Sequence, residues 1–175
     1  MKNTFLLFII FVLPGSLAAA TNPNLCQSAL ISTTPDERFT EQVDPSIVYD
    51  RRTGLFWQRC PLGLSYDAVN NVCSGTMQYS YTEALNQALA LDNGDPQFAW
   101  RLPNIKELAS IAERKCAKPA LNLNIFYNFD ERIPLFWSST VKDSQHVYII
   151  NFENGTTDLR NPDLNASVRL VADGP

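Results

Sequence analysis

The sequence predicts an α+β fold in which two helices pack on a mainly antiparallel sheet. Two segments each begin with a helix-capping pair and continue with apolar residues at helical spacing. Short runs rich in β-branched and aromatic residues lie before and after these segments, separated by turn-forming residues. We expect the early hairpin to join the later strands in an antiparallel sheet.

The first helix is expected to begin near Ser80. Ser80 and Glu83 have the spacing of a capping box, in which each side chain binds the backbone amide of the other residue. The run Asp-Asn-Gly-Asp-Pro at 92–96 ends the helix. Its predicted apolar stripe consists of Ala84, Leu85, Ala88 and Leu89.

The second helix is expected to begin at Pro103-Asn104. Asn104 precedes Glu107 by three residues, which again has the spacing of a cap. The helix is predicted to end at Ala-Lys-Pro, residues 117–119. Its predicted buried face consists of Ile105, Leu108, Ala109, Ile111 and Ala112.

Strands are predicted on both sides of the helices. Before them, residues 47–49 and 55–57 form a hairpin around turn-forming residues 50–54. After them, Asn154-Gly155 predicts a second hairpin, in which both central turn residues take positive φ. The later strands are expected at 136–140, 146–152, 156–159 and 168–171.

Residues 1–20 have the three parts of a secretory signal peptide. Lys2 supplies a positive charge, residues 5–13 are an unbroken apolar run, and 18–20 are alanines suited to cleavage. The apolar run is too short to span a bilayer, which requires about 20 residues. We therefore expect export, cleavage after Ala20 and no membrane span.

The rest of the chain is expected to form one domain. An extended segment rich in Thr, Pro, Asn and Ser occupies 21–45, and 46–175 is long enough for a single core. The net charge of −4 becomes −5 when Lys2 is removed. Such a charge disfavours nucleic acid and anionic membranes as partners.

Four cysteines in an exported chain predict two disulfides. Three pairings are formally open. The segment between Cys60 and Cys73 is rich in Pro, Gly and Asn and suits a closed loop, worth about 3 kcal/mol in the chain-entropy model. Cys26 would then pair with Cys116 and tie the N-terminal segment to the second helix. A zinc site is disfavoured because no Cys-x-x-Cys pair exists and His146 is the single histidine.

Four motifs occur in order along the chain. They are TGLFWQ at 53–58, WRLPNIKEL at 100–108, FWSST at 136–140 and VRLV at 168–171. Over about residues 46–171 the chain resembles the bacterial family named after the C-terminal domain of the Legionella collagen-like adhesin, a domain of unknown function.

The resemblance implies a C-type-lectin-like fold with paired N- and C-terminal strands, two flanking helices and a long loop region. The domain of the founding member binds sulfated glycans. This chain has no collagen-like repeat and is acidic overall.

The resemblance also implies a ligand site in the loops between the second helix and the later strands, about residues 120–135. Amide, phenol and charged side chains there can bind sugar hydroxyls or stack on a sugar ring. The candidate ligand-binding residues are Asn122, Asn124, Tyr127, Asn128, Asp130, Glu131 and Arg132.

The conspicuous motif residues are interpreted as structural. Trp57, Trp100 and Trp137 lie in apolar or β-rich contexts and are expected in the core rather than stacked on a sugar. Arg101 and Arg169 have apolar neighbours and are expected to be partly buried, bound to carbonyls or a carboxylate rather than to a substrate.

An enzyme is the minority interpretation. His146 alternates with apolar residues on a predicted strand, and no nucleophile-elbow, P-loop or dinucleotide-binding motif is present. A formylglycine-generating type of oxidase would need free cysteines. Asp92, Asn93 and Asp95 are weak calcium candidates, because the run lacks the distant glutamate of an EF-hand. We expect no catalytic residues and no cofactor.

The leading hypothesis is an exported recognition module that binds a glycan or a protein at the cell surface or in the envelope. The alternative is a structural or assembly subunit of an envelope or pilus apparatus. That alternative predicts an exposed apolar patch. Its candidate residues are Ile125, Phe126, Phe129 and Leu135.

Overall fold

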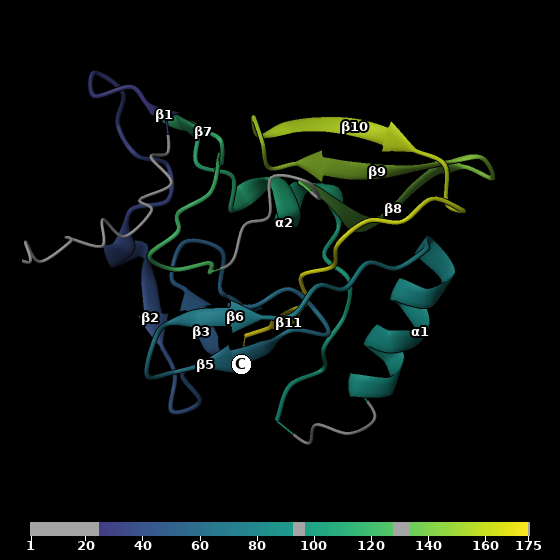
Figure 1. The fold of residues 1–175 in the computed structure, drawn as a ribbon, viewed down its shortest axis with the longest axis horizontal. Helices are drawn as coiled ribbons and strands as arrows, with labels where there is room; N and C mark the ends of the chain where they lie inside the picture. The colour runs from purple at the N-terminus through teal and green to yellow at the C-terminus, as the bar shows by residue number, and fades with distance from the viewer. Residues whose placement is uncertain (1–24, 93–96, 128–133, 175) are drawn as a thin grey trace, which may run out of the picture.

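The computed structural model describes residues 25–92, 97–127 and 134–174 and has an α+β fold with mostly antiparallel sheets (Figure 1). A three-stranded sheet and a four-stranded sheet lie at opposite sides of the molecule, with α2 between them and α1 at one flank. The predicted signal peptide at 1–20 lies outside the described residues. Among the residues that are described, no helix is long and apolar enough to cross a membrane.

The four-stranded sheet has the order β11-β4-β3-β2. The predicted early hairpin is confirmed as β3 (Ile47–Asp50) and β4 (Leu55–Gln58), which pair with Val48 opposite Trp57. Strand β2 (Phe39–Glu41) pairs with β3, so the segment expected as an extended lead-in contributes an edge strand to this sheet.

The last strand differs from the prediction in its start and its neighbour. β11 (Val171–Asp173) begins three residues later than expected and pairs with β4 rather than with the first strand. The stretch before it bridges the two sheets, because the Ser167 carbonyl accepts from β8 while the Leu170 carbonyl accepts from Gln58 of β4. Backbone groups shared between two sheets cannot continue a single ladder.

The three-stranded sheet contains β8 (Leu135–Asp143), β9 (His146–Asn151) and β10 (Thr156–Arg160). The predicted hairpin between β9 and β10 is confirmed, but its turn is of another kind. Thr156 pairs with Asn151, which leaves a four-residue loop in which Gly155 has a φ of 75° and Asn154 does not have a positive φ. The prediction of a two-residue turn with two positive φ angles was therefore wrong.

Helix α1 (Tyr81–Asp92) begins and ends where the sequence predicts. The Ser80 amide donates to Glu83 at 2.8 Å, as a capping box requires. The predicted apolar stripe is wrong in part: Ala84 and Ala88 are buried, whereas Leu85 and Leu89 are 41% and 59% exposed. The alanines face the core, and the two leucines lie farther around the helix, where they line a surface cavity of about 440 Å³.

Helix α2 (Ile105–Ser110) has the predicted start but is shorter than predicted. Asn104 forms the full capping box with Glu107. The helix ends before Glu113, whose backbone amide donates to the Ala120 carbonyl instead of continuing the helical pattern. The predicted helical residues Cys116–Ala117 form strand β7.

Both predicted disulfides are confirmed. Cys26–Cys116 joins β1 (Leu25–Cys26) to its antiparallel partner β7. Cys60–Cys73 closes a loop that contains the hairpin of β5 (Ser65–Asp67) and β6 (Val72–Ser74).

The core contains the three tryptophans, as predicted. Trp57 and Trp137 are fully buried and Trp100 is 4% exposed. Buried residues group into two clusters, one that includes Trp57 and α2, and another that includes Trp100, Trp137 and the alanines of α1. Burial of aromatic side chains of this size supplies a large apolar contribution to stability.

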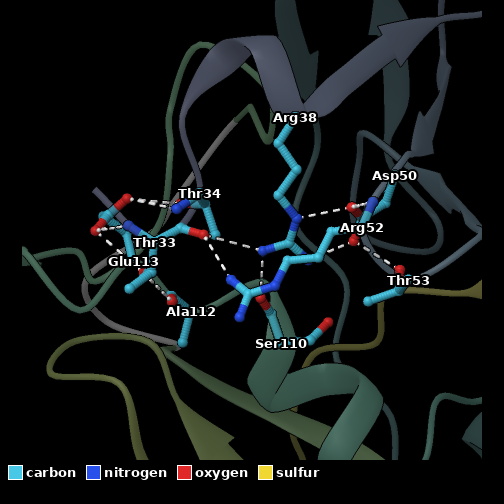
Figure 2. A network of polar contacts seen from close by, with 9 residues as sticks. All are labelled: Thr33, Thr34, Arg38, Asp50, Arg52, Thr53, Ser110, Ala112 and Glu113. Atoms are coloured by element: carbon cyan, nitrogen blue, oxygen red, sulfur yellow. Dashed lines mark hydrogen bonds and ion pairs between the residues drawn. The ribbon is translucent and has the colours of Figure 1, made fainter. Parts of the chain in front are cut away.

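A polar network attaches the N-terminal segment to this core (Figure 2). Arg38, in the short 3-10 helix η1 (Asp36–Arg38), donates from Nε to Asp50 at 2.7 Å and forms a second bond to the same carboxylate through Nη2. Its Nη1 reaches the Thr33 carbonyl at 3.1 Å. Glu113 accepts from the amides of Thr33 and Thr34, both at 3.0 Å.

Glu113 makes part of the stability depend on pH. Burial alone would raise the pKa of its carboxyl, but hydrogen bonds from Ser32 and from three backbone amides outweigh that effect and lower the pKa from 4.5 to about 2. Because the folded-state pKa is depressed, the stabilisation is present above pH 4.5 and is lost as the pH falls towards 2. We expect Glu113→Gln to cost about 3 kcal/mol at pH 7 and much less at pH 2 in urea unfolding.

The matched control is Glu37→Gln at an exposed site on η1. It should leave the free energy of unfolding within about 0.5 kcal/mol of that of the unmodified chain. A cost of Glu113→Gln that is the same at both pH values would contradict this account.

Candidate functional site

A groove of about 680 Å³ lies between the β2–β3 turn, the end of β4, the disulfide loop and helix α1. Its volume falls within the range of about 300–1,000 Å³ that is typical of small-ligand pockets. The groove is lined by Asp44, Pro45, Ser46, Gln58, Cys60, Pro61, Leu62, Gly63, Leu64, Tyr66, Ala68, Tyr79, Gln87 and Leu91.

A disulfide and a backbone hydrogen bond position the groove wall formed by residues 60–64. The Cys60–Cys73 disulfide closes the loop, and the Leu62 amide donates to the Val168 carbonyl at 2.8 Å. Gln58 reaches the groove because side chains alternate along β4, with Leu55 and Trp57 buried and Gln58 half-buried. These contacts fix the groove on the core rather than on a free loop.

Tyr79 contributes a phenol to the groove wall. Its backbone is fixed by paired bonds with Ala166, both at 3.0 Å, and its carbonyl also accepts from Trp137 Nε1 at 2.8 Å. The residue is 8% exposed, and its hydroxyl makes no hydrogen bond within the described part of the chain. Burial, followed by the nearby Glu83 carboxylate, raises the pKa of this phenol, so it is a neutral donor at physiological pH.

Gly63 is required by the position of Tyr79. Its φ is +84°, a conformation that favours glycine, and a Cβ atom at this position would lie 2.5 Å from the Tyr79 hydroxyl. The Gln58 side chain, like the Tyr79 hydroxyl, makes no hydrogen bond within the described part of the chain. The groove therefore offers an amide and a phenol for binding a ligand.

Tyr66 on the rim belongs to an aromatic and arginine cluster. Its ring stacks on Tyr127, with centroids 5.7 Å apart and planes at 11°. The Arg59 guanidinium lies 4.3 Å from the centroid of the Tyr127 ring and donates to its hydroxyl. Burial raises the pKa of the Tyr127 phenol, and the positive charge of Arg59 only partly opposes this effect. The cluster packs Tyr66 of the rim against Tyr127 and Arg59.

Of the sequence-predicted ligand residues, the structure describes Asn122, Asn124 and Tyr127. Asn122 and Asn124 both donate their side-chain amides to the Asp36 carboxylate, at 2.7 and 2.9 Å, and line a different cavity of about 400 Å³. Asn122 also donates to the Thr34 carbonyl. Their polar atoms are thus bound to the N-terminal segment, whereas Tyr127 lies beside Tyr66.

The remaining predicted ligand residues lie outside the described part of the chain. These are Asn128, Asp130, Glu131 and Arg132. The same is true of the calcium candidates Asn93 and Asp95, while Asp92 is the last residue of α1. Within the residues that are described, no three His, Cys, Asp or Glu side chains gather as a metal site.

The two arginines of the motifs have internal partners. Arg101 pairs with Glu107 at 2.9 Å and with Asp173 at 2.7 Å. Arg169 is fully buried, donates from Nη1 to the carbonyls of Gln58 and Arg59, and lies 4.9 Å from the Phe126 ring centroid. Burial lowers the pKa of the Arg169 guanidinium. Both arginines therefore hold the fold together.

His146 is exposed at the start of β9. Its Nδ1 lies 2.8 Å from Oδ1 of Asp143, the last residue of β8 in the same hairpin. This pair lies apart from the residues that line the groove.

The sequence-based site prediction missed Gln58, Gly63 and Tyr79. One signal was present in the segment between Cys60 and Cys73, where a Pro-Leu-Gly turn and Tyr66 lie in a loop closed by a disulfide. The contribution of Tyr79 had no local signal, because its place depends on pairing with Ala166 far along the chain.

Comparison with known proteins places the chain in a family. No curated protein matches it. The family model described as the Lcl C-terminal domain matches residues 46–172, from β3 to the middle of β11. The chain therefore belongs to the Lcl C-terminal domain family.

Proposed function

We propose that the protein is an exported, non-enzymatic recognition module that binds a glycan in the groove, on a C-type-lectin-like fold. The observation that carries this proposal is the phenol of Tyr79, which lines the groove and makes no hydrogen bond within the described residues. A ligand hydroxyl in the groove could bond to it, and such a bond contributes about 0.5–1.5 kcal/mol.

The rest of the groove supports a sugar ligand. Gln58 and Gln87 offer amides for hydroxyl groups, and Tyr66 with the leucines of the loop offers apolar surface for C–H faces. A few placed polar groups on an apolar wall are typical of small-molecule sites.

Export is proposed on two grounds. The residues at 1–20 have the pattern of a signal peptide, and the two disulfides suit an oxidising compartment. A periplasmic, cell-surface or secreted location follows from this proposal. Its partners would be surface glycans or envelope proteins rather than nucleic acid.

For the assembly-subunit alternative, two of the four residues expected in the exposed apolar patch are buried. Ile125 and Phe126, expected in an exposed apolar patch, are core residues that are 8% and 0% exposed. Leu135 is half-buried, and Phe129 lies outside the described residues. An enzymatic role, centred on His146, remains a third hypothesis that activity screening of His146→Ala would test.

A glycan array followed by calorimetry tests the proposal. We expect Tyr79→Phe and Gln58→Ala each to weaken glycan binding about 5–10-fold, the effect of one hydrogen bond. Tyr79→Phe should leave thermal stability unchanged, because the hydroxyl has no hydrogen bond to lose within the described part of the protein.

The matched controls are Tyr148→Phe on β9 and Gln145→Ala in the β8–β9 turn, neither of which lines the groove. Both should bind like the unmodified chain. Absence of glycan binding, or equal effects of the groove and control variants, would overturn the proposed function.

A further inference from the structure

We propose that the groove selects uncharged oligosaccharides and rejects sulfated or carboxylated ones. This inference rests on the proposed glycan-binding function and specifies its ligand class. It follows from the charges that line the groove and from the contacts of the nearest arginine.

Among the described residues, the groove wall contains a carboxylate and no basic side chain. Asp44 is the single Asp or Glu among these lining residues, and no Lys or Arg is among them. Asp44 is exposed and is fixed at the rim, because its Oδ1 accepts from the Ser46 amide at 2.8 Å. An anionic group in the groove would face this carboxylate without a cation to pair with.

Arg59, whose guanidinium lies 5.7 Å from the centroid of the Tyr66 ring at the rim, is already fully engaged. It is 4% exposed and forms an ion pair with Glu41 at 2.6 Å. Its other donors bind the carbonyls of Ile125 and Asn124 and the hydroxyl of Tyr127. A sulfate group could pair with this guanidinium only by replacing one of these hydrogen bonds.

The polar groups that remain free suit neutral sugar hydroxyls. The Tyr79 phenol and the Gln58 amide are uncharged and both have donor capacity. Each can bond to a hydroxyl, but neither neutralises a sulfate that loses its hydration on entering the groove. The hydrogen-bonding groups and the local charge therefore favour the same ligand class.

The test compares maltohexaose, cellohexaose and chitohexaose with their sulfated derivatives, using calorimetry of the full chain at low and at physiological salt. We expect at least one neutral hexasaccharide to bind, and its sulfated form to bind at least 10-fold more weakly. Because the carboxylate is exposed, the discrimination should decrease as salt increases.

Charge variants test whether Asp44 causes the discrimination between neutral and sulfated hexasaccharides. Asp44→Lys should reduce it at least 10-fold at low salt, and Asp44→Asn, which keeps an acceptor for the Ser46 amide, should reduce it about 3-fold. The control Asp158→Lys makes the same charge change at an exposed position on β10 that does not line the groove, and should leave the discrimination unchanged.

The outcomes separate the two proposals. If a sulfated hexasaccharide binds as tightly as its neutral form, or if Asp44→Lys behaves like Asp158→Lys, the selectivity inference is wrong while glycan binding stands. If no hexasaccharide of either kind binds, the proposed function fails and this inference fails with it.

Discussion

Replacement of Asp50 by alanine should lower the free energy of unfolding by about 3–5 kcal/mol, because it leaves the Arg38 guanidinium buried without its counter-ion. Asp50 is fully buried and Arg38 is 8% exposed. The carboxylate also accepts from the Thr53 hydroxyl at 2.7 Å and from the Arg52 amide at 3.0 Å (Figure 2). Urea unfolding at pH 7 measures the loss.

Two further variants make this prediction specific. Arg38→Met combined with Asp50→Ala should be at least 1 kcal/mol more stable than the Asp50→Ala chain, since it removes the buried charge. Asp173→Ala breaks the ion pair with Arg101. The Asp173 side chain is 70% exposed and the Arg101 side chain 36%, so this change should cost less than about 1 kcal/mol. An Asp50→Ala cost as small as that of Asp173→Ala would contradict the role given to the buried pair.

Removal of the Cys26–Cys116 disulfide should have an effect of similar size. In the chain-entropy model, a link across 90 residues of sequence is worth about 4.6 kcal/mol, and one across 13 residues about 3 kcal/mol. We therefore expect Cys26→Ser with Cys116→Ser to destabilise the chain by roughly 1.6 kcal/mol more than Cys60→Ser with Cys73→Ser. Equilibrium unfolding of the two double variants gives the comparison.

The same variants separate stability from binding. The Cys60–Cys73 link builds the groove wall, so its removal should weaken glycan binding even under conditions where the chain is fully folded. The Cys26–Cys116 link does not line the groove, so its removal should leave binding intact under those conditions. The reverse pattern would place the ligand near Asn122 and Asn124, in the cavity that Cys26 and Cys116 help to line.

Local signals explain what the sequence predicts correctly. Both helix starts have capping boxes, and the strands of both hairpins lie within about ten residues of each other along the chain. The disulfide pairing followed from the composition of the segment between Cys60 and Cys73, and the family from four motifs in order.

Long-range contacts explain the features of the fold that the sequence does not predict. The sequence of β2 has no hydrophobic periodicity, and it becomes a strand by pairing with β3. The position of η1 depends on the hydrogen bonds that Arg38 donates to Asp50. The predicted end of α2 was wrong because Glu113 is committed to the N-terminal segment, about 80 residues away in sequence. The groove has the same origin, since Tyr79 and Gln58 meet only in the folded chain.

Membership of the family leaves the ligand open. A sulfated ligand would require cations, and the described residues of the groove wall include no Lys or Arg. We therefore propose a neutral ligand for this member. Many residues of the four motifs belong to the core, and Gln58, at the end of the first motif, lines the groove. Trp57, Trp137 and Arg169, all fully buried, illustrate that division.

The most direct test of the central claim is an NMR titration of the full chain with the neutral hexasaccharide that binds most tightly. We predict that the amide shifts that change most belong to residues 58–66 and 79 in the groove. Changes confined to the cavity around Asn122, or to the hairpin of His146, would contradict the assignment of the groove as the glycan site.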